Sequence, residues 1–174
     1  QDSISLTQIF FTNGSTMRCK DYSAFFNTYN AIAERCYQCY KVQMEPRTLQ
    51  DLLVLYALSK NLKIESENER KCMCELRNYA RGMYKGLIYC TSRKEANEVK
   101  AFVDIAIRTK TDLGIKSSIK RGCTEFSNAH NDYGLIKDDE EDNPYQPNDW
   151  QQLEKKYLKK SFMPKGHTTI INFN

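Results

Sequence analysis

The stretch SENERKCMCELRNYARGMYKGLIYCTSRKEANEVKAFVDIAIRTKTDLG, residues 66–114, carries the most regular apolar pattern of the chain. In its first half, apolar residues recur at steps of three and four, as they do along one face of a helix; they are Cys72, Met73, Leu76, Tyr79, Ala80, Met83, Tyr84, Leu87 and Ile88. Its second half repeats the pattern with Ala96, Val99, Phe102, Val103, Ala106 and Ile107. The spacing predicts two amphipathic helices joined by a short break, a helical hairpin.

Residues that favour helix ends flank both halves of this stretch. Each half begins with a serine followed three residues later by a glutamate, at 66–69 and 92–95. In such a capping box the serine oxygen accepts an otherwise unpaired backbone N–H, and the glutamate accepts another. Gly114 tolerates the left-handed backbone of a helix end. The two helices therefore have defined boundaries.

The remaining segments complete a helical pattern. Residues 23–44, 48–61 and 150–162 carry apolar stripes at helical spacing, and 48–61 is apolar almost all round, which is typical of a central buried helix. Residues 3–12 alternate, and 168–173 are rich in β-branched side chains, so both predict short strands that pair with each other or with a neighbouring subunit. We expect a mainly α protein, a single-domain helical bundle of about five helices with short terminal β-strands.

Composition divides the chain into three parts. Residues 1–136 form the expected helical core with its N-terminal strand. Residues 137–149 are acidic and contain Pro144 and Pro147, which is typical of a linker. Residues 150–174 hold an amphipathic helix and the strand-like tail, expected to pack on the core or on a neighbouring subunit.

The overall composition limits the class of protein to which the chain can belong. The chain has 174 residues, 40% of them hydrophobic and 28% charged, as in an ordinary globular domain. A domain of this size buries about 70% of the surface that its unfolded chain exposes. The longest apolar run, Leu52 to Leu58, is far shorter than the ~20 residues of a membrane-spanning helix, so the sequence predicts no membrane span.

Charge is unevenly distributed along the chain. Residues 70–121 hold thirteen basic and five acidic residues, a local charge of +8 in a protein of net charge +4. Within the predicted hairpin, basic residues at four-residue steps form a stripe. The candidate partner- or phosphate-binding residues are Arg77, Arg81, Lys85, Arg93 and Lys94. The alternative is that these charges lie on solvated outer faces.

Seven cysteines cannot all pair within one chain. Cys36-x-x-Cys39 with Cys72-x-Cys74 is the nearest pattern to a zinc motif, for which four soft ligands must converge. If Cys72 and Cys74 were helical, however, they would point about 200° apart. Buried structural thiols are the alternative that this geometry favours, so we expect no cofactor and keep these four cysteines as the candidate metal ligands.

Two compartments fit the cysteines. Free thiols favour a reducing intracellular compartment or a virion. Gln1, as the first residue of a processed chain, and the glycosylation sequon Asn13-Gly14-Ser15 keep secretion open. Richness in Lys, Asn, Tyr and Ile suggests an AT-rich genome, such as that of a large DNA virus or a protozoan.

The sequence contains no catalytic constellation. It lacks a phosphate-binding glycine loop, a nucleophile elbow and a dinucleotide fingerprint, so an enzyme is not expected. We hypothesise a structural or assembly protein, for example a viral structural component, that works through protein–protein contacts with other subunits. One alternative is a nucleic-acid-binding protein that uses the basic hairpin 66–114. A second is a secreted helical signalling or host-directed protein.

Overall fold

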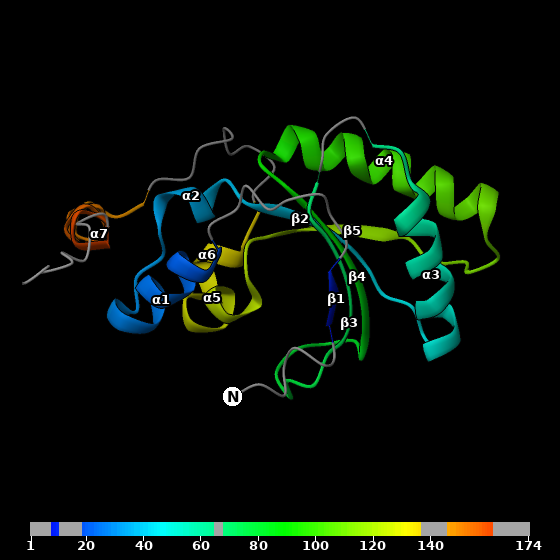
Figure 1. The fold of residues 1–174 in the computed structure, drawn as a ribbon, viewed down its shortest axis with the longest axis horizontal. Coiled ribbons are helices and arrows are strands. Elements are labelled where there is room, and N and C mark those ends of the chain that lie inside the picture. Colours follow the sequence, from blue (N-terminus) through cyan, green and yellow to red (C-terminus); the bar gives the residue numbers. More distant parts are fainter. Residues whose placement is uncertain (1–7, 11–18, 65–67, 137–145, 162–174) are drawn as a thin grey trace, which may run out of the picture.

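A five-stranded antiparallel sheet lies at the centre of the protein (Figure 1). The computed structural model describes residues 8–10, 19–64, 68–136 and 146–161. The strands, in spatial order, are β1 (Gln8–Phe10), β3 (Arg70–Cys74), β4 (Tyr84–Cys90), β2 (Tyr40–Met44) and β5 (Ser117–Arg121). The expected all-α helical bundle is therefore wrong: the protein has a sheet-containing α/β fold.

Seven helices accompany the sheet in the described part of the chain. They are α1 (Cys19–Tyr29), α2 (Glu34–Tyr37), α3 (Leu49–Asn61), α4 (Arg93–Lys110), α5 (Thr124–Ala129), α6 (Asn131–Gly134) and α7 (Asn148–Ser161). From β2 to β5 the chain runs β-α-β-β-α-β, with β4 and β2 as the central strands. This is the split βαβ, or ferredoxin-like, topology. β1 extends the sheet at its β3 edge.

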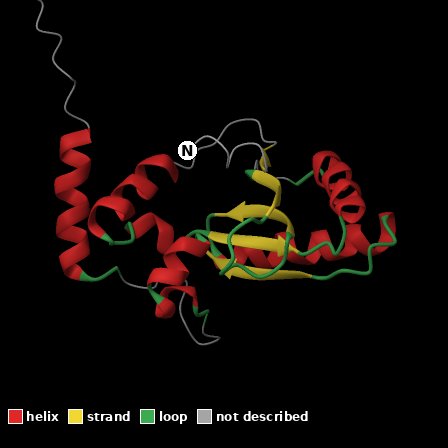
Figure 2. Ribbon diagram, turned by 90° about the horizontal axis from the view of Figure 1, so that it is seen from below, coloured by secondary structure: helices red, strands yellow, loops and turns green. Residues whose placement is uncertain are grey.

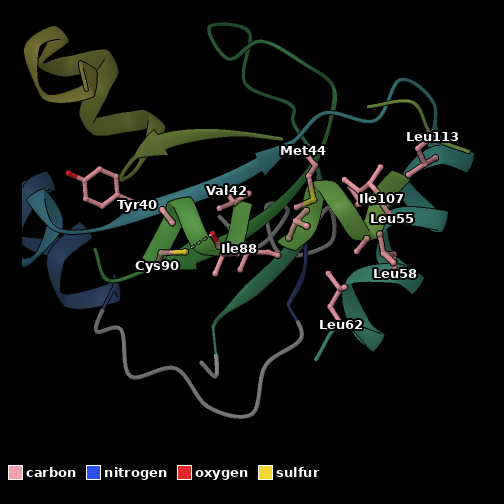
Figure 3. Packing of buried hydrophobic residues seen from close by; sticks show 14 residues of the cluster. Tyr40, Val42, Met44, Leu55, Leu58, Leu62, Ile88, Cys90, Ile107 and Leu113 are labelled. Carbon is pink, nitrogen blue, oxygen red and sulfur yellow. Dashed lines mark hydrogen bonds between the residues drawn. The ribbon is translucent and has the colours of Figure 1, made fainter. Parts of the chain in front are cut away.

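The helices form two groups around the sheet. α3 and α4 cover one sheet face, and the other five helices gather beside the sheet (Figures 1 and 2). The first group closes the main hydrophobic core, in which Val42, Ile88 and Leu55 have no exposed surface (Figure 3). The second group surrounds a separate aromatic cluster built on Phe25 and Phe126. We call these the sheet–helix core and the aromatic lobe.

The first helix of the predicted hairpin is instead the β3–β4 hairpin. Cys72 pairs with Gly86 and Cys74 with Tyr84, and the backbone N–H of Glu75 closes the loop onto the carbonyl of Met83 at 2.6 Å. Most of β4 is buried, so its apolar residues run continuously, and such a run fits helical and strand spacing alike.

Gly86 shows why the strand is favoured at this point. A Cβ on Gly86 would lie 2.6 Å from Leu55 Cδ2, so the absence of a side chain lets α3 approach the sheet closely. In an exposed helix the same glycine would cost about 1 kcal/mol relative to alanine. The tertiary contact with α3 therefore decides the local structure.

The long helix expected over residues 23–44 is also wrong. Asn30 adopts a positive φ of 50°, which ends α1, and α2 is only four residues long. Residues 40–44 form the central strand β2, whose Tyr40, Val42 and Met44 alternate toward α3 and α4.

Helices α3 and α4 confirm two sequence predictions. The Thr48 hydroxyl accepts the N–H of Asp51, and the Ser92 hydroxyl accepts the N–H of Glu95 at 3.1 Å. The Glu95 carboxylate accepts from the N–H of Thr91 at 2.7 Å, one residue before the expected donor. Gly114 has φ +60° but does not end α4, because that helix stops at Lys110 and Thr111 is its C-cap; the predicted position of the helix end is wrong.

Two terminal predictions have different outcomes. The N-terminal strand exists over Gln8–Phe10, where it pairs with β3. The C-terminal run 168–173 and Ser66 of the first capping box lie outside the described residues. Glu69 directly precedes β3 and does not begin a helix.

Candidate functional site

The outward sides of α3 and α4 expose large apolar side chains. α3 is not the buried central helix that its composition predicts, because only its inner side contacts the sheet. The exposed residues are Leu49 (53% exposed), Leu53 (57%), Val54 (40%), Phe102 (43%) and Ile105 (51%). We call these five residues the outer helical surface. Exposed charges on the same two helices include Lys60, Glu98 and Arg108.

A second group of exposed apolar residues lies in the β3–β4 loop, residues 75–83. Leu76 and Met83 are 73% and 63% exposed, and Tyr79 is 46% exposed. The Arg77 guanidinium lies 5.7 Å from the centre of the Tyr79 ring, within reach of a cation–π contact. The loop therefore presents both apolar and cationic groups.

Glu75 anchors this loop to the sheet. Its buried carboxylate accepts hydrogen bonds from Arg77 Nε at 2.7 Å and from Lys85 Nζ at 3.0 Å. Burial raises the pKa of Glu75, but the hydrogen bonds from Arg77 and Lys85 outweigh burial and lower it to about 2. Arg77 also pairs with Glu125 at the start of α5. The network neutralises most of the charge at this end of the sheet.

The sheet face turned away from α3 and α4 carries lysines among the apolar residues Met73, Leu87 and Tyr89. Each of the four strands β2 to β5 places one lysine there, because directly paired residues share a face: Lys41, Lys71, Lys85 and Lys120. Lys41 is 5% exposed and donates to Thr124 Oγ1 at 3.4 Å, and burial lowers its pKa. Lys120 pairs with Glu45 at 3.7 Å. Lys41 and Lys85 are therefore buried on this face, whereas Lys120 is exposed.

The predicted stripe of Arg77, Arg81 and Lys85 does not form, and the five candidate binding residues do not lie together. Arg77 and Lys85 meet at Glu75, Arg81 is exposed in the β3–β4 loop, and Arg93 and Lys94 lie in the first turn of α4. β4 separates Arg81 from Arg93, so the two lie at opposite ends of that strand. The stripe required a helix where the chain forms a strand.

The four cysteines predicted as metal ligands divide into two pairs. Cys72 pairs with Gly86, which on its other side pairs with Met44, the last residue of β2. Cys39 instead directly precedes Tyr40, the first residue of β2. Cys36 and Cys39 instead line a pocket together with Cys19, Cys90 and Cys123. The sequence carries no local signal for this grouping, since its members come from separate elements. In the described part of the chain, no three His, Cys, Asp or Glu side chains stand in metal-ligating positions.

His130 is the one histidine in the described residues. Its Nε2 lies 2.9 Å from the Asn30 carbonyl oxygen, and its ring packs 4.9 Å from Trp150. These contacts give His130 a structural role within the aromatic lobe. His167 lies outside the described residues.

Comparison with known proteins identifies no relative. No family model, no curated protein and no solved structure matches this chain. Among the helices that the structure describes, none has the length and apolar character to cross a bilayer.

Proposed function

We propose that the protein is a non-enzymatic structural or assembly protein whose subunits associate through the outer helical surface. The observation that carries the proposal is the exposure of Leu49, Leu53, Val54, Phe102 and Ile105 on two neighbouring helices. Scattered apolar residues are normal on a protein surface, but large side chains grouped on one layer mark interaction sites. A reducing intracellular compartment suits the seven cysteines, all of which are free thiols.

Energetics set the minimum size of such a contact. Fully burying one large apolar side chain contributes ~1.5–3 kcal/mol relative to leaving it exposed. About half of each of the five side chains remains to be buried, so the five from one subunit supply roughly 4–8 kcal/mol, and a partner that uses the same surface supplies as much again. Association costs an estimated ~4–15 kcal/mol in lost freedom of motion. The gain and the cost are thus of similar size, so a stable contact needs further contacts around the outer helical surface.

Sedimentation velocity over a range of protein concentrations tests this proposal. We expect the protein to self-associate, and Leu53→Lys or Phe102→Lys to weaken association at least tenfold, since burying a charge adds to the lost apolar contact. Met83→Lys is the matched control, because Met83 is 63% exposed but lies in the β3–β4 loop. A monomer at all concentrations, or equal effects of Leu53→Lys and Met83→Lys, contradicts the proposal.

The β3–β4 loop supports a second candidate function, nucleic-acid binding. Tyr79 is partly exposed beside Arg77, and Arg81 is exposed in the same loop, a combination that can stack on a base and contact a phosphate. Filter binding at low salt tests this candidate. We expect Arg81→Glu to reduce retention of single-stranded RNA or DNA and added salt to abolish it; no retention by the unmodified protein excludes it.

A further inference from the structure

A pocket of about 40 Å³ lies between the aromatic lobe and one end of the sheet. Its walls come from α1, α2 and α5 and from the chain next to β2, β4 and β5. One water molecule needs roughly 10–15 Å³ of such space, so the pocket holds a group of about three or four atoms other than hydrogen. We call it the cysteine pocket, because it is lined by Cys19, Cys36, Cys39, Cys90 and Cys123.

The cysteine pocket has a polar opening and an apolar inner wall. The lining residues that are exposed lie where the pocket meets solvent, and they are Cys19, Ser23, Arg35 and Thr91. The lining residues that are buried form the inner wall, and they are Cys36, Cys90, Gly122 and Phe126. Polarity therefore falls from the opening inward, as it does in a site for a small molecule with one polar and one apolar end.

The thiols around the pocket are uncharged at neutral pH. Burial raises the pKa of Cys39 and that of Cys90 to about 12, and it also raises the pKa of Cys36. A protonated cysteine packs as a small, polarizable apolar residue. The inner wall therefore favours an apolar group over an ion.

Two backbone groups beside the inner wall already have partners. The N–H of Gly122 donates to the carbonyl of Cys39 at 2.7 Å. The carbonyl of Cys36 accepts from Tyr133 Oη at 2.7 Å and from the N–H of Cys39 at 3.2 Å. A buried water typically needs about three hydrogen bonds to polar groups, and these groups do not offer them. An alkyl group that displaces water from this wall therefore gains affinity.

Arg35 carries the one charge at neutral pH among the described residues that line the pocket. None of the ion pairs within the described part of the chain involves Arg35. The backbone on either side of it is held in place, because the N–H of Glu34 donates to Glu154 Oε2 at 2.8 Å and the Cys36 carbonyl accepts from Tyr133. A guanidinium offers a planar set of donors that matches a carboxylate. The opening of the pocket is thus suited to a carboxylate.

We propose that the cysteine pocket binds a short-chain aliphatic carboxylate, with its alkyl group against the inner wall and its carboxylate on the Arg35 guanidinium. The volume limits the length of the chain: about three carbons fill the pocket, as in butyrate. An amine of the same length is disfavoured, because it would place a second cation beside Arg35. This site is separate from the outer helical surface and does not depend on the proposed assembly function.

A titration of the full-length protein with acetate, propionate, butyrate and hexanoate, followed by two-dimensional NMR of the backbone amides, tests the site. We expect saturable shifts at the amides of Cys36, Cys90 and Gly122. Affinity should rise about fourfold with each methylene from acetate to butyrate, which should reach a Kd on the order of 1 mM. Hexanoate should bind no more tightly than butyrate, because the pocket is already full. Butyramide has nearly the same shape without the charge and should bind at least about tenfold more weakly.

Two arginine variants show whether the carboxylate contacts Arg35. Arg35→Gln changes an exposed side chain, so the protein should fold, and it should weaken butyrate binding at least about tenfold while leaving butyramide binding unchanged. Arg47→Gln is the matched control. Arg47 is also exposed, but it lies just before α3 and does not line the pocket, so its loss should leave butyrate binding unchanged.

Three outcomes overturn the proposal. One is wild-type protein that shows no saturable shift at the lining amides with any of the four acids, a measurement that needs no variant. Another is equal affinity of the wild-type protein for butyrate and butyramide, which would leave the carboxylate without a role. The third is Arg47→Gln weakening butyrate binding as much as Arg35→Gln, which would indicate a general attraction of anions to the protein.

Discussion

The sheet–helix core and the aromatic lobe use different means to hold the chain. In the core, aliphatic side chains pack between a sheet and two long helices of 13 and 18 residues. In the lobe, rings of Phe25, Tyr37, Phe126 and Tyr133 pack among helices of which α2, α5 and α6 have four, six and four residues. Isolated helices of that length are not stable in water, so tertiary contacts must hold the lobe together.

Buried hydrogen bonds from side chains to backbone carbonyls are among the contacts that hold the lobe together. Tyr133 Oη donates to the Cys36 carbonyl at 2.7 Å, and Gln146 Nε2 donates to the Ile32 carbonyl at 2.8 Å. In the core, by contrast, ladders of backbone bonds connect every strand to a neighbour. This difference predicts that disrupting the sheet–helix core unfolds the whole chain. The aromatic lobe, in contrast, can unfold locally while the core stays folded. The single tryptophan, Trp150, packs in the lobe and reports on it by fluorescence.

The largest effect is expected in the sheet–helix core. Leu55 is fully buried above Gly86, so Leu55→Ala leaves a cavity and should lower the free energy of unfolding by ~2–5 kcal/mol. Urea titration followed by far-ultraviolet circular dichroism and by Trp150 fluorescence should show both signals shifting together. Leu76→Ala is the control, because Leu76 is 73% exposed, and it should change stability by less than about 0.5 kcal/mol. A shift of Trp150 fluorescence alone would contradict the assignment of Leu55 to the shared core.

Parts of the core were predictable from sequence because their signals are local. The N-terminal cap of helix α4 at Ser92 and its apolar stripe lie in one continuous stretch of sequence. Helix α3 likewise follows directly on its N-terminal cap, Thr48. Such helices need no distant partner to define their boundaries. The sequence therefore predicts both helices and their N-terminal caps, although α4 ends at Lys110, four residues before Gly114.

The sheet was not predictable in this way because its partners are distant. Tyr40 pairs with Cys90 on one side and with Arg121 on the other, and no local pattern records either pairing. The same holds for the candidate sites. Side chains alternate along β4, which turns Lys85 toward Glu75, where the two form an ion pair. Only the folded chain brings Cys123 next to Cys39, because the two are far apart in sequence. Exposure of Leu53 depends on which side of α3 meets the sheet, which its nearly uniform apolar sequence leaves open.

An effect of comparable size, but confined to the lobe, is expected at Gly122. An alanine at φ +46° is strained by ~1–2 kcal/mol, and its methyl group would displace Tyr133, which adds about 1–3 kcal/mol. Trp150 fluorescence should then change at lower urea concentration than the far-ultraviolet signal. Gly114→Ala is the matched control, since Gly114 has φ +60° but open space around it, with the nearest atom, Arg47 Nη2, 3.9 Å away. Equal losses in the two variants would show that strain alone, without the Tyr133 contact, accounts for the effect.

The smallest effect tests a single hydrogen bond of the lobe. Tyr133→Phe keeps the ring contacts with Tyr37 and Phe126 at 5.3 and 5.9 Å but leaves the Cys36 carbonyl without the hydroxyl donor. The Cys36 carbonyl still accepts the N–H of Cys39 at 3.2 Å, so losing one buried hydrogen bond should cost ~0.5–1.5 kcal/mol. The loss should appear in Trp150 fluorescence before it appears in the sheet. Tyr79→Phe removes an equivalent hydroxyl from a ring that is 46% exposed in the β3–β4 loop and should be neutral. If Tyr133→Phe shifts the core and the lobe signals together, the two clusters unfold as one unit and the distinction between them fails.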